Sequence, residues 1–150
     1  MEITTYRWGV PEQLHVGDDS LVLFPHGLVG FEHLKRFALL HDEQSAICWF
    51  QSLDEPETAF AALDAFIIDS RYDIELSPAD AEALQLRSEA EVAVFSLLTV
   101  RLDPEEYITA NLLAPVVLNT RLRAGRQVIL QDSGYDLQFR VQPEVLAAVA

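Results

Sequence analysis

The sequence predicts a mainly β protein, a small β-barrel-like domain with one or two short helices. Many short apolar or alternating runs follow one another along the chain, and residues typical of turns separate them at regular intervals. The length of 150 residues fits a single domain, which we place over residues 1–150. Because 50% of the residues are hydrophobic, the chain can bury a sizeable core and does not belong to the disordered class.

The first half of the chain is expected to consist of strands. In the opening strand Thr4, Tyr6 and Trp8 share one face, and Pro11 ends the run because proline cannot donate to a sheet ladder. The expected strands of this half cover residues 3–8, 21–24, 35–40, 47–52, 59–63 and 66–68.

One segment, residues 77–84, predicts a short helix. Ser77 can cap the free amides, and Pro78 suits the first helical position. Asp80 and Glu82 then lie near the positive end of the helix dipole, where carboxylates are stabilising.

The second half returns to strands. Residues 91–102 are apolar on both faces over most of their length, which is typical of a central strand covered on both sides. Residues 107–119 are extended and broken at Pro115, since proline belongs at a sheet edge or a bulge. The remaining expected elements are a turn at Ala124 and Gly125, a strand over residues 127–130, a half-buried strand over residues 137–141 and a short helix from Pro143 onward.

The charge balance narrows the classes of partner. Asp and Glu outnumber Lys and Arg 24 to 10, which gives a formal net charge of −14. We therefore expect neither direct nucleic-acid binding nor membrane binding, because both need clustered cations. Glu2 stands where a signal peptide carries positive charge, and no apolar run reaches the ~20 residues of a spanning helix, so we expect a cytoplasmic protein.

Residues that carry catalysis in other proteins occur here in unfavourable settings. Paired acids lie in expected turns or at helix starts, where carboxylates are solvated. His26, His33 and His41 could meet in space, yet they lack metal-ligand spacing, and we expect them in surface loops. Cys48, the single cysteine, is expected to be a small core hydrophobe, since one cysteine makes neither an internal disulfide nor a cysteine-based zinc cluster.

We therefore expect no catalytic, cofactor or metal site, and interpret the chain as an acidic module that attracts basic proteins. The basic cluster of Arg121, Arg123 and Arg126 flanks a turn and is expected to project into water. Two alternatives remain open. A small acidic hydrolase requires a cleft with two converging acids, and a barrel that binds an apolar ligand requires a sizeable closed cavity.

Three stretches together resemble the flagellar assembly factor FliW family. The first is FPHGLVGFE at residues 24–32, followed by FALL at residues 37–40. The second is WFQSLDEP at residues 49–56, followed by Ala59 and Phe60. The third is NLLAPVVLN at residues 111–119, followed by GRQVIL at residues 125–130. Their order and spacing match the family from about residue 3 to residue 141, so the chain resembles a single FliW-like domain.

The resemblance implies a small β-barrel-like fold and no catalysis. It further implies two protein partners: CsrA, a small RNA-binding translational repressor, and flagellin. Family members relieve CsrA repression of flagellin translation by noncompetitive antagonism, and accumulating flagellin takes them away from CsrA. In the first motif, which more often reads Phe-x-Asp/Glu-Gly-Leu/Ile-Pro-Gly-Phe, His26 replaces the acid and Val29 replaces the proline, which we expect to leave the turn freer.

Eight positions within these motifs are candidates for partner contact. Asn111 and Asn119 bracket the proline-broken stretch, where they can hydrogen-bond a turn or help to form an edge for a partner segment. Phe24 and Phe31 flank the glycine loop and are expected to be core residues rather than interface anchors. The candidate partner-binding residues are Asn111, Leu112, Pro115, Asn119, Gly27, Phe31, Gln51 and Ser52.

Overall fold

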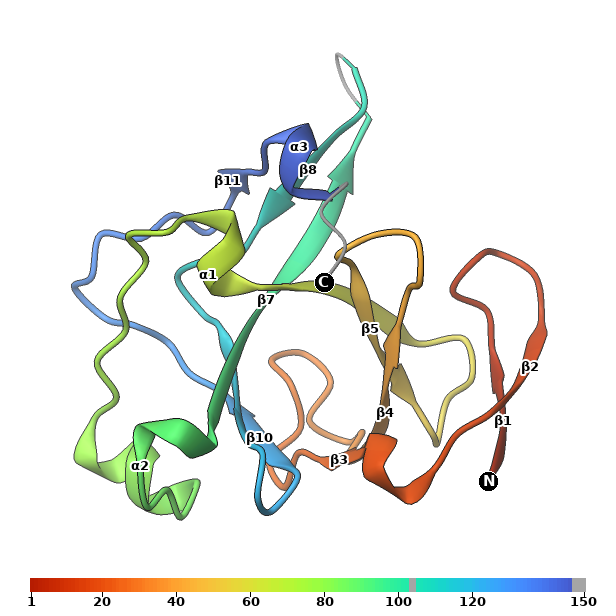
Figure 1. Ribbon diagram of the computed structural model, residues 1–150, viewed down its shortest axis with the longest axis horizontal. Coiled ribbons are helices and arrows are strands. Elements are labelled where there is room, and N and C mark those ends of the chain that lie inside the picture. Colours follow the sequence, from red (N-terminus) through yellow and green to blue (C-terminus); the bar gives the residue numbers. More distant parts are fainter. Residues whose placement is uncertain (103–104, 147–150) are drawn as a thin grey trace.

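Seven strands close into a barrel in the computed structural model, which describes residues 1–102 and 105–146 (Figure 1). The strands follow the order β3-β4-β5-β6-β7-β9-β10, and β10 returns to β3. Their bounds are β3 Leu21–Leu23, β4 Arg36–His41, β5 Cys48–Ser52, β6 Ala59–Asp64, β7 Val92–Arg101, β9 Val116–Asn119 and β10 Ala124–Gln127.

The long strand β7 joins the barrel to an extension at one end of the molecule. One edge of β7 pairs with β6, while the other pairs first with β9 through residues 92–95 and then with β8 through residues 98–101. β8 (Tyr107–Ala110) pairs in turn with β11 (Phe139–Arg140). Together with α3 (Pro143–Leu146), these strands project beyond the barrel (Figure 1).

A separate hairpin covers the outer face of β4 and β5. It consists of β1 (Glu2–Thr5) and β2 (Glu12–His15), which pair only with each other among the described residues. The other elements are the 3₁₀ helices η1 (Asp18–Ser20) and η2 (Glu89–Glu91) and the helices α1 (Ala65–Ile68) and α2 (Pro78–Ala83). Both α1 and α2 lie in the connection between β6 and β7.

The alternation of side chains in β4 divides them between two cores. Phe37 points into the barrel, where aromatic rings pack edge to face at centroid distances of 5.3 Å for Phe24–Phe37 and 5.7 Å for Phe24–Phe50. Ala38 and Leu40 point outward and pack beneath the β1–β2 hairpin. A one-residue slip of β4 would move Phe37 out of the barrel core and place Ala38 and Leu40 in it, where they fill less space, so the register of β4 is strongly specified.

The predicted fold class is confirmed: the protein is mainly β, with a seven-stranded barrel and short helices. The predicted helix is present as α2, and the Ser77 hydroxyl accepts a hydrogen bond from the Asp80 N–H at 3.1 Å. The break at Pro115 is also confirmed, because β8 ends before it and β9 begins after it. Both strands can thereby pair with the same edge of β7.

Two predictions for the first half are wrong. Residues 66–68 are not a strand, because the Asp64 carboxylate accepts the Phe66 N–H at 2.9 Å and caps α1 directly after β6. The opening strand ends at Thr5 rather than at Trp8, since the Thr5 hydroxyl accepts the Arg7 N–H and the chain turns. β2 has no counterpart among the predicted strands, because its sequence EQLH holds one apolar residue.

The predicted boundaries after residue 119 are displaced. Ala124 and Gly125 lie in β10, and the turn precedes them at residues 120–123. The strand expected over residues 127–130 therefore shares a single residue with β10. The last expected strand, residues 137–141, shortens to the two residues of β11, and Leu137 is exposed.

The interpretation of residues 91–102 as a strand covered on both faces holds for only its first part. Val94 and Ser96 are buried where β7 lies in the barrel wall. Val100 and Leu102 are 56% and 74% exposed, because the chain leaves the barrel there.

Candidate functional site

The first motif forms the loop between β3 and β4, residues 24–35. Phe24, Leu28 and Leu34 are buried and anchor the loop in the barrel core. Gly27 has a φ of +67°, and a Cβ there would lie 2.5 Å from the Glu32 Cα, so the tight loop requires glycine. Between these anchors the tip of the loop, including Val29, faces solvent.

One side chain connects the tip of this loop to the third motif. The Gln127 amide accepts the Val29 N–H through Oε1 at 2.9 Å and donates through Nε2 to the Ala114 oxygen at 3.0 Å. This hydrogen bond restrains the turn at the position where the family more often has proline. Proline has no N–H, so Val29 permits a tie that the usual family residue would exclude.

The second motif ends in a turn beside the loop. The Gln51 side chain is fully buried, and its Nε2 donates to the carbonyl oxygens of Ser52, Pro56 and Thr58 at 3.0–3.2 Å. The Ser52 hydroxyl accepts the N–H groups of residues 54 and 55. Both residues thus build the turn at residues 53–58.

The two asparagines of the third motif hold turns at either end of it. The Asn111 oxygen accepts the Ala114 N–H at 2.9 Å. Asn119 is fully buried, and its amide donates to the Leu84 oxygen at 2.8 Å while its oxygen accepts the N–H groups of Arg121 and Leu122. Asn119 therefore joins the α2 region to the β9–β10 turn. Leu112 and Pro115 are buried between these ends.

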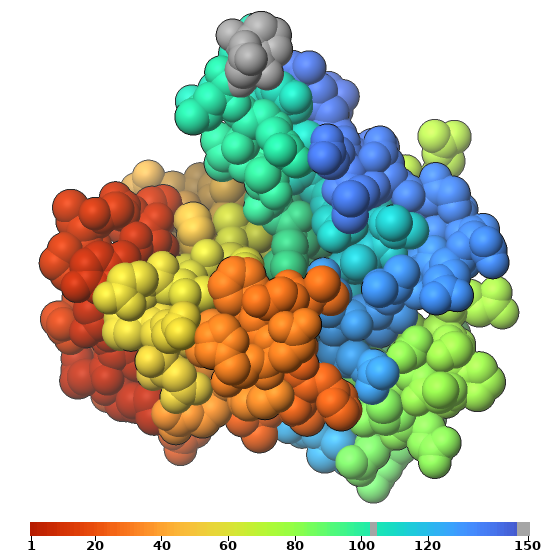
Figure 2. Space-filling view, turned by 180° about the vertical axis from the view of Figure 1, so that it is seen from behind, coloured from red at the N-terminus to blue at the C-terminus, as the bar shows by residue number. Residues whose placement is uncertain are grey.

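The loop 24–35, the turn 53–58 and the segment 111–115 together form what we call the motif face. Figure 2 shows the orange loop at the centre of one side of the molecule, with the yellow turn on one flank and the blue segment that contains Gln127 on the other. The rings of Phe31 and Phe60 stack edge to face at 4.9 Å between loop and strand β6. His33 also reaches Glu55 across the boundary at 3.1 Å.

The candidate residues differ in their access to solvent. Phe31 and Asn111 are half-buried, while Gly27, Gln51, Ser52, Leu112, Pro115 and Asn119 are buried. A partner that docks on the motif face meets Phe31, Asn111 and exposed neighbours such as Val29, and the buried candidates hold those groups in place. Sequence reasoning missed Val29 and Gln127 as a connecting pair, since residues 98 positions apart give no local signal.

The electrostatics of the motif face are mixed rather than uniformly acidic. Arg36 and Asp54 form an exposed ion pair at 2.6 Å. The pKa of Glu32 is lowered because its carboxylate accepts hydrogen bonds from its own N–H and from Gly30 N–H. The acidic surplus lies elsewhere: residues 64–91 hold eight acids against Arg71 and Arg87.

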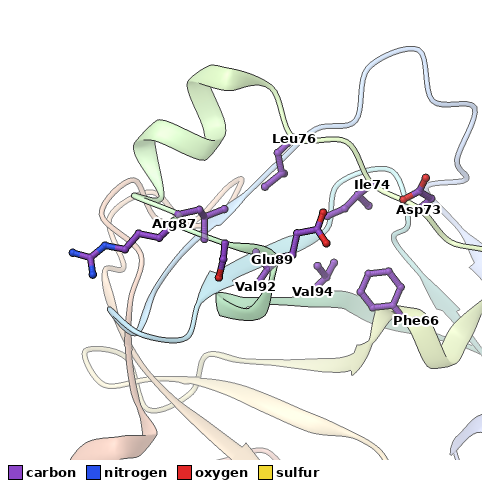
Figure 3. A pocket seen from close by; sticks show the side chains of 10 residues that line it. Phe66, Asp73, Ile74, Leu76, Arg87, Glu89, Val92 and Val94 are labelled. Carbon is purple, nitrogen blue, oxygen red and sulfur yellow. The ribbon is translucent and has the colours of Figure 1, made fainter.

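An open groove of about 540 Å³ lies in this acidic region, between α1 and the first residues of β7 (Figure 3). Phe66, Ile74 and Val94 give it an apolar lining, and the Glu89 carboxylate lies among them (Figure 3). Its lining contains no histidine or cysteine. The groove can therefore bind an apolar side chain of another molecule that carries a positive charge nearby.

The single cysteine is buried, and the three histidines of the predicted loops lie at the surface. Burial raises the pKa of Cys48 to about 12, so its thiol stays protonated and hydrophobic, as the sequence predicted. His26, His33 and His41 are exposed, and within residues 1–102 and 105–146 no cluster of His, Cys, Asp or Glu is arranged to hold a metal ion. No helix in the same residues is long and apolar enough to cross a membrane.

The expectation that the arginine cluster projects freely into water is wrong. Arg121 pairs with Glu91 at 2.8 Å, and Arg126 with Asp80 at 3.2 Å. Arg123 donates to the Leu21 oxygen at 3.0 Å. These three cations brace the β9–β10 turn against η2, α2 and β3. Cations and acids far apart in sequence meet because the barrel closes.

The interior of the barrel is filled by aromatic rings, which disfavours the alternative of a barrel that encloses an apolar ligand. Phe24, Phe37 and Phe50 are fully buried, and Phe50 packs against Phe95 at 5.5 Å. The fold and the motif face thus define a small barrel protein with a packed interior, whose distinctive residues build an outer surface.

Comparisons with known proteins agree with this class. The model of the FliW protein family matches residues 5–141. A flagellar assembly factor FliW of Anoxybacillus flavithermus is 42% identical over 129 residues, covering 86% of this chain and 88% of that protein. A second, from Syntrophus aciditrophicus, is 34% identical over 142 residues, covering 94% and 87%. A crystal structure of a flagellar assembly factor FliW superposes with a TM-score of 0.84 at 34% identity, over 95% of this chain and 98% of that one. The chain belongs to the FliW family of flagellar assembly factors.

Proposed function

We propose that this chain is a cytoplasmic flagellar assembly factor that binds a CsrA-like RNA-binding protein and flagellin. In this role it relieves CsrA repression of flagellin translation by noncompetitive antagonism. The observation that carries the proposal is the family match over residues 5–141, which spans all three motifs of the motif face. We further propose that the chain acts as one domain, without cofactor, and by binding rather than by catalysis.

The acidic surplus suggests how binding weakens the hold of CsrA on RNA. A body of net charge −14 docked beside a basic RNA-binding surface lowers the positive potential that the phosphates experience. Each phosphate contact that is lost weakens RNA binding and flattens its salt dependence by about 0.7 on single strands. The same charge opposes direct binding of nucleic acid or an anionic membrane by this chain.

We propose the motif face as the partner surface, with the eight candidate residues in two roles. Phe31 and Asn111 are half-buried and contact the partner, together with the exposed Val29. The six buried candidates shape the surface: Gly27, Gln51, Ser52, Leu112, Pro115 and Asn119. A buried residue of this kind affects binding only when its loss deforms the loop that it holds.

A matched pair of variants tests this assignment. Val29 and Val10 are both 62% exposed, but Val29 lies on the motif face and Val10 follows β1 in the turn toward β2. Purified wild type, Val29→Glu and Val10→Glu are tested for capture of the CsrA-like protein and of flagellin at low and high salt. We expect Val29→Glu to weaken at least one complex tenfold or more, and Val10→Glu to leave both unchanged.

Three outcomes contradict the proposal, each in a different part. Capture of neither partner by the wild-type chain removes the partner assignment. Equal effects of the two substitutions leave the partners in place but remove the motif face as their surface. Inhibition of RNA binding that does not fade as salt rises contradicts the electrostatic mechanism alone.

A further inference from the structure

The groove between α1 and β7 has an exposed aromatic ring on one side. Phe66 of α1 is 44% exposed and lines the groove, whereas Ala65 and Ile68 of the same helix are buried in the core (Figure 3). The Asp64 cap fixes where the helix begins, and residues 65 and 68 then share the inner face, because side chains three positions apart lie on one side of a helix. The outward direction of Phe66 is therefore imposed by the fold.

The rest of the apolar lining belongs to the packed core. It comes from the start of β7, from the chain before α2 and from the chain after it. All of its members except Phe66 lie in one core cluster or pack against it, so packing holds the shape of the groove. The apolar lining residues are Phe66, Ile74, Leu76, Leu86, Val92 and Val94.

Two carboxylates line the same groove without a neutralising partner. Asp73 and Glu89 are exposed, and the Glu89 side chain lies among the apolar lining residues (Figure 3). Within residues 1–102 and 105–146, no Lys, Arg or His forms an ion pair with either carboxylate. The cation that lines the groove, Arg87, points away from the other lining side chains (Figure 3). The groove thus presents negative charge beside apolar surface.

The chain around the groove adds to this negative charge. Of the eight acids in residues 64–91, Asp80 pairs with Arg126 and Glu91 pairs with Arg121. The other acids of this segment form no ion pair with any described residue. Interfaces bring potentials of opposite sign together, so the charge that fits beside the groove is positive. The matching ligand therefore combines apolar groups with adjacent cations.

Two other kinds of occupant match the groove less well. A second copy of this chain carries a net charge of −14, which repels the acids around the groove. A small molecule is usually enclosed by a concave site that buries most of its surface, whereas this groove is open along its length (Figure 3). A segment of a basic protein supplies both the apolar groups and the cations.

We propose that the groove between α1 and β7 binds an amphipathic helical segment of a protein partner, with large apolar side chains on one face and Lys or Arg beside them. A helix places side chains at positions i, i+3 and i+4 on one face, so that they enter a groove together. Its cations then lie near Asp73 and Glu89. The groove shares no lining residue with the motif face, so this site does not depend on what the motif face binds.

A synthetic helical peptide, Lys-Lys-Leu-Ala-Lys-Phe-Leu-Ala-Lys-Leu-Ala-Lys-Lys, tests the occupant. Titrated into the isotopically labelled protein, it should shift the NMR signals of Phe66, Val92 and Val94, and its binding should weaken as salt rises. Replacing its Leu and Phe by Ser, or its Lys by Glu, should weaken binding about tenfold or more. Absence of binding, equal binding of the Ser peptide, or shifts confined to residues outside the groove overturns the proposal.

Phe66→Ser and Ile67→Ser provide matched variants of the protein. The two residues are neighbours in α1 and are 44% and 43% exposed, but only Phe66 lines the groove. Phe66→Ser should weaken peptide binding about tenfold or more, because it removes an apolar contact, and Ile67→Ser should leave binding unchanged. Equal binding by the two variants overturns the proposal.

A second pair of variants tests the charge and decides the question if Phe66→Ser does not fold. Glu89→Lys and Glu43→Lys change the net charge equally, and both residues are exposed, but only Glu89 lines the groove. Glu89→Lys should weaken peptide binding about fivefold or more and Glu43→Lys should affect it less, so equal effects overturn the proposal.

Two further measurements test the other occupants. The protein alone should sediment as a monomer; self-association that Phe66→Ser abolishes and Ile67→Ser preserves would assign the groove to a second copy and overturn the proposal. The small apolar cation octyltrimethylammonium should bind more weakly than the peptide, and tighter binding of it in the groove would overturn the proposal in favour of a small molecule.

Discussion

Replacing Asn119 by alanine should destabilise the protein more than any other asparagine substitution in the third motif. Asn119 is fully buried, and its amide donates to the Leu84 oxygen at 2.8 Å and the Gln85 oxygen at 3.3 Å. Its oxygen accepts the N–H groups of Arg121 and Leu122 at 3.0 and 3.1 Å. One side chain therefore satisfies backbone groups of two loops that no sheet pairing reaches.

The magnitude follows from the groups that the truncation leaves unpaired. A buried backbone group without a partner costs about 1–3 kcal/mol, and partly exposed groups recover most of that cost from water. Leu84 is buried and the other three partners are partly accessible, so we expect a loss of about 2–4 kcal/mol. In a chain of 150 residues this corresponds to a Tm lower by roughly 5–15 °C.

Asn111→Ala is the matched control, because Asn111 makes one such hydrogen bond, to the Ala114 N–H, and is half-buried. Urea unfolding of the wild type and both variants measures the difference, and we expect Asn111→Ala to cost about 1 kcal/mol. If Asn119→Ala costs no more than Asn111→Ala, the bridging role of Asn119 is refuted.

Three further predictions follow from other sites. Val29→Pro removes the N–H that Gln127 accepts, so stability should fall by about 1 kcal/mol in urea unfolding, while in Gln127→Ala, which already lacks that hydrogen bond, the same change should cost nothing. Cys48, with its pKa raised to about 12, should not react with a thiol reagent at pH 8 in the folded protein, and rapid labelling would show that the barrel opens readily. The pKa of Glu91 is lowered from 4.5 by the Arg87 N–H and by Arg121, so the contribution of Glu91 to stability is present above pH 4.5 and is lost as the pH falls below it. In a series of unfolding curves at different pH, the stability of Glu91→Gln should therefore decline less on the acid side than that of the wild type.

The sequence by itself determined the class of fold and most of its elements. Apolar runs separated by Pro and Gly indicated the barrel strands, and the Ser77–Pro78 pair indicated α2, because capping and proline geometry act within a few residues. The burial of Phe24 and Cys48 also followed from the local pattern. The three motifs pointed to the family to which the chain belongs.

Local signals failed where a distant or competing contact decided the conformation. Residues 66–68 have apolar side chains that suit a strand, but the Asp64 cap begins a helix there. The turn after β9 starts early because Asn119 is fixed by the α2 region, which lies about 35 residues away in sequence.

Only the tertiary structure decided how the candidate residues are arranged. Closure of the barrel places Gln127 between Val29 and Ala114, buries six of the eight candidates and pairs the arginines with acids. The physical reason is that strand pairing joins residues far apart in the chain. No pattern within one strand records which distant residues it will face.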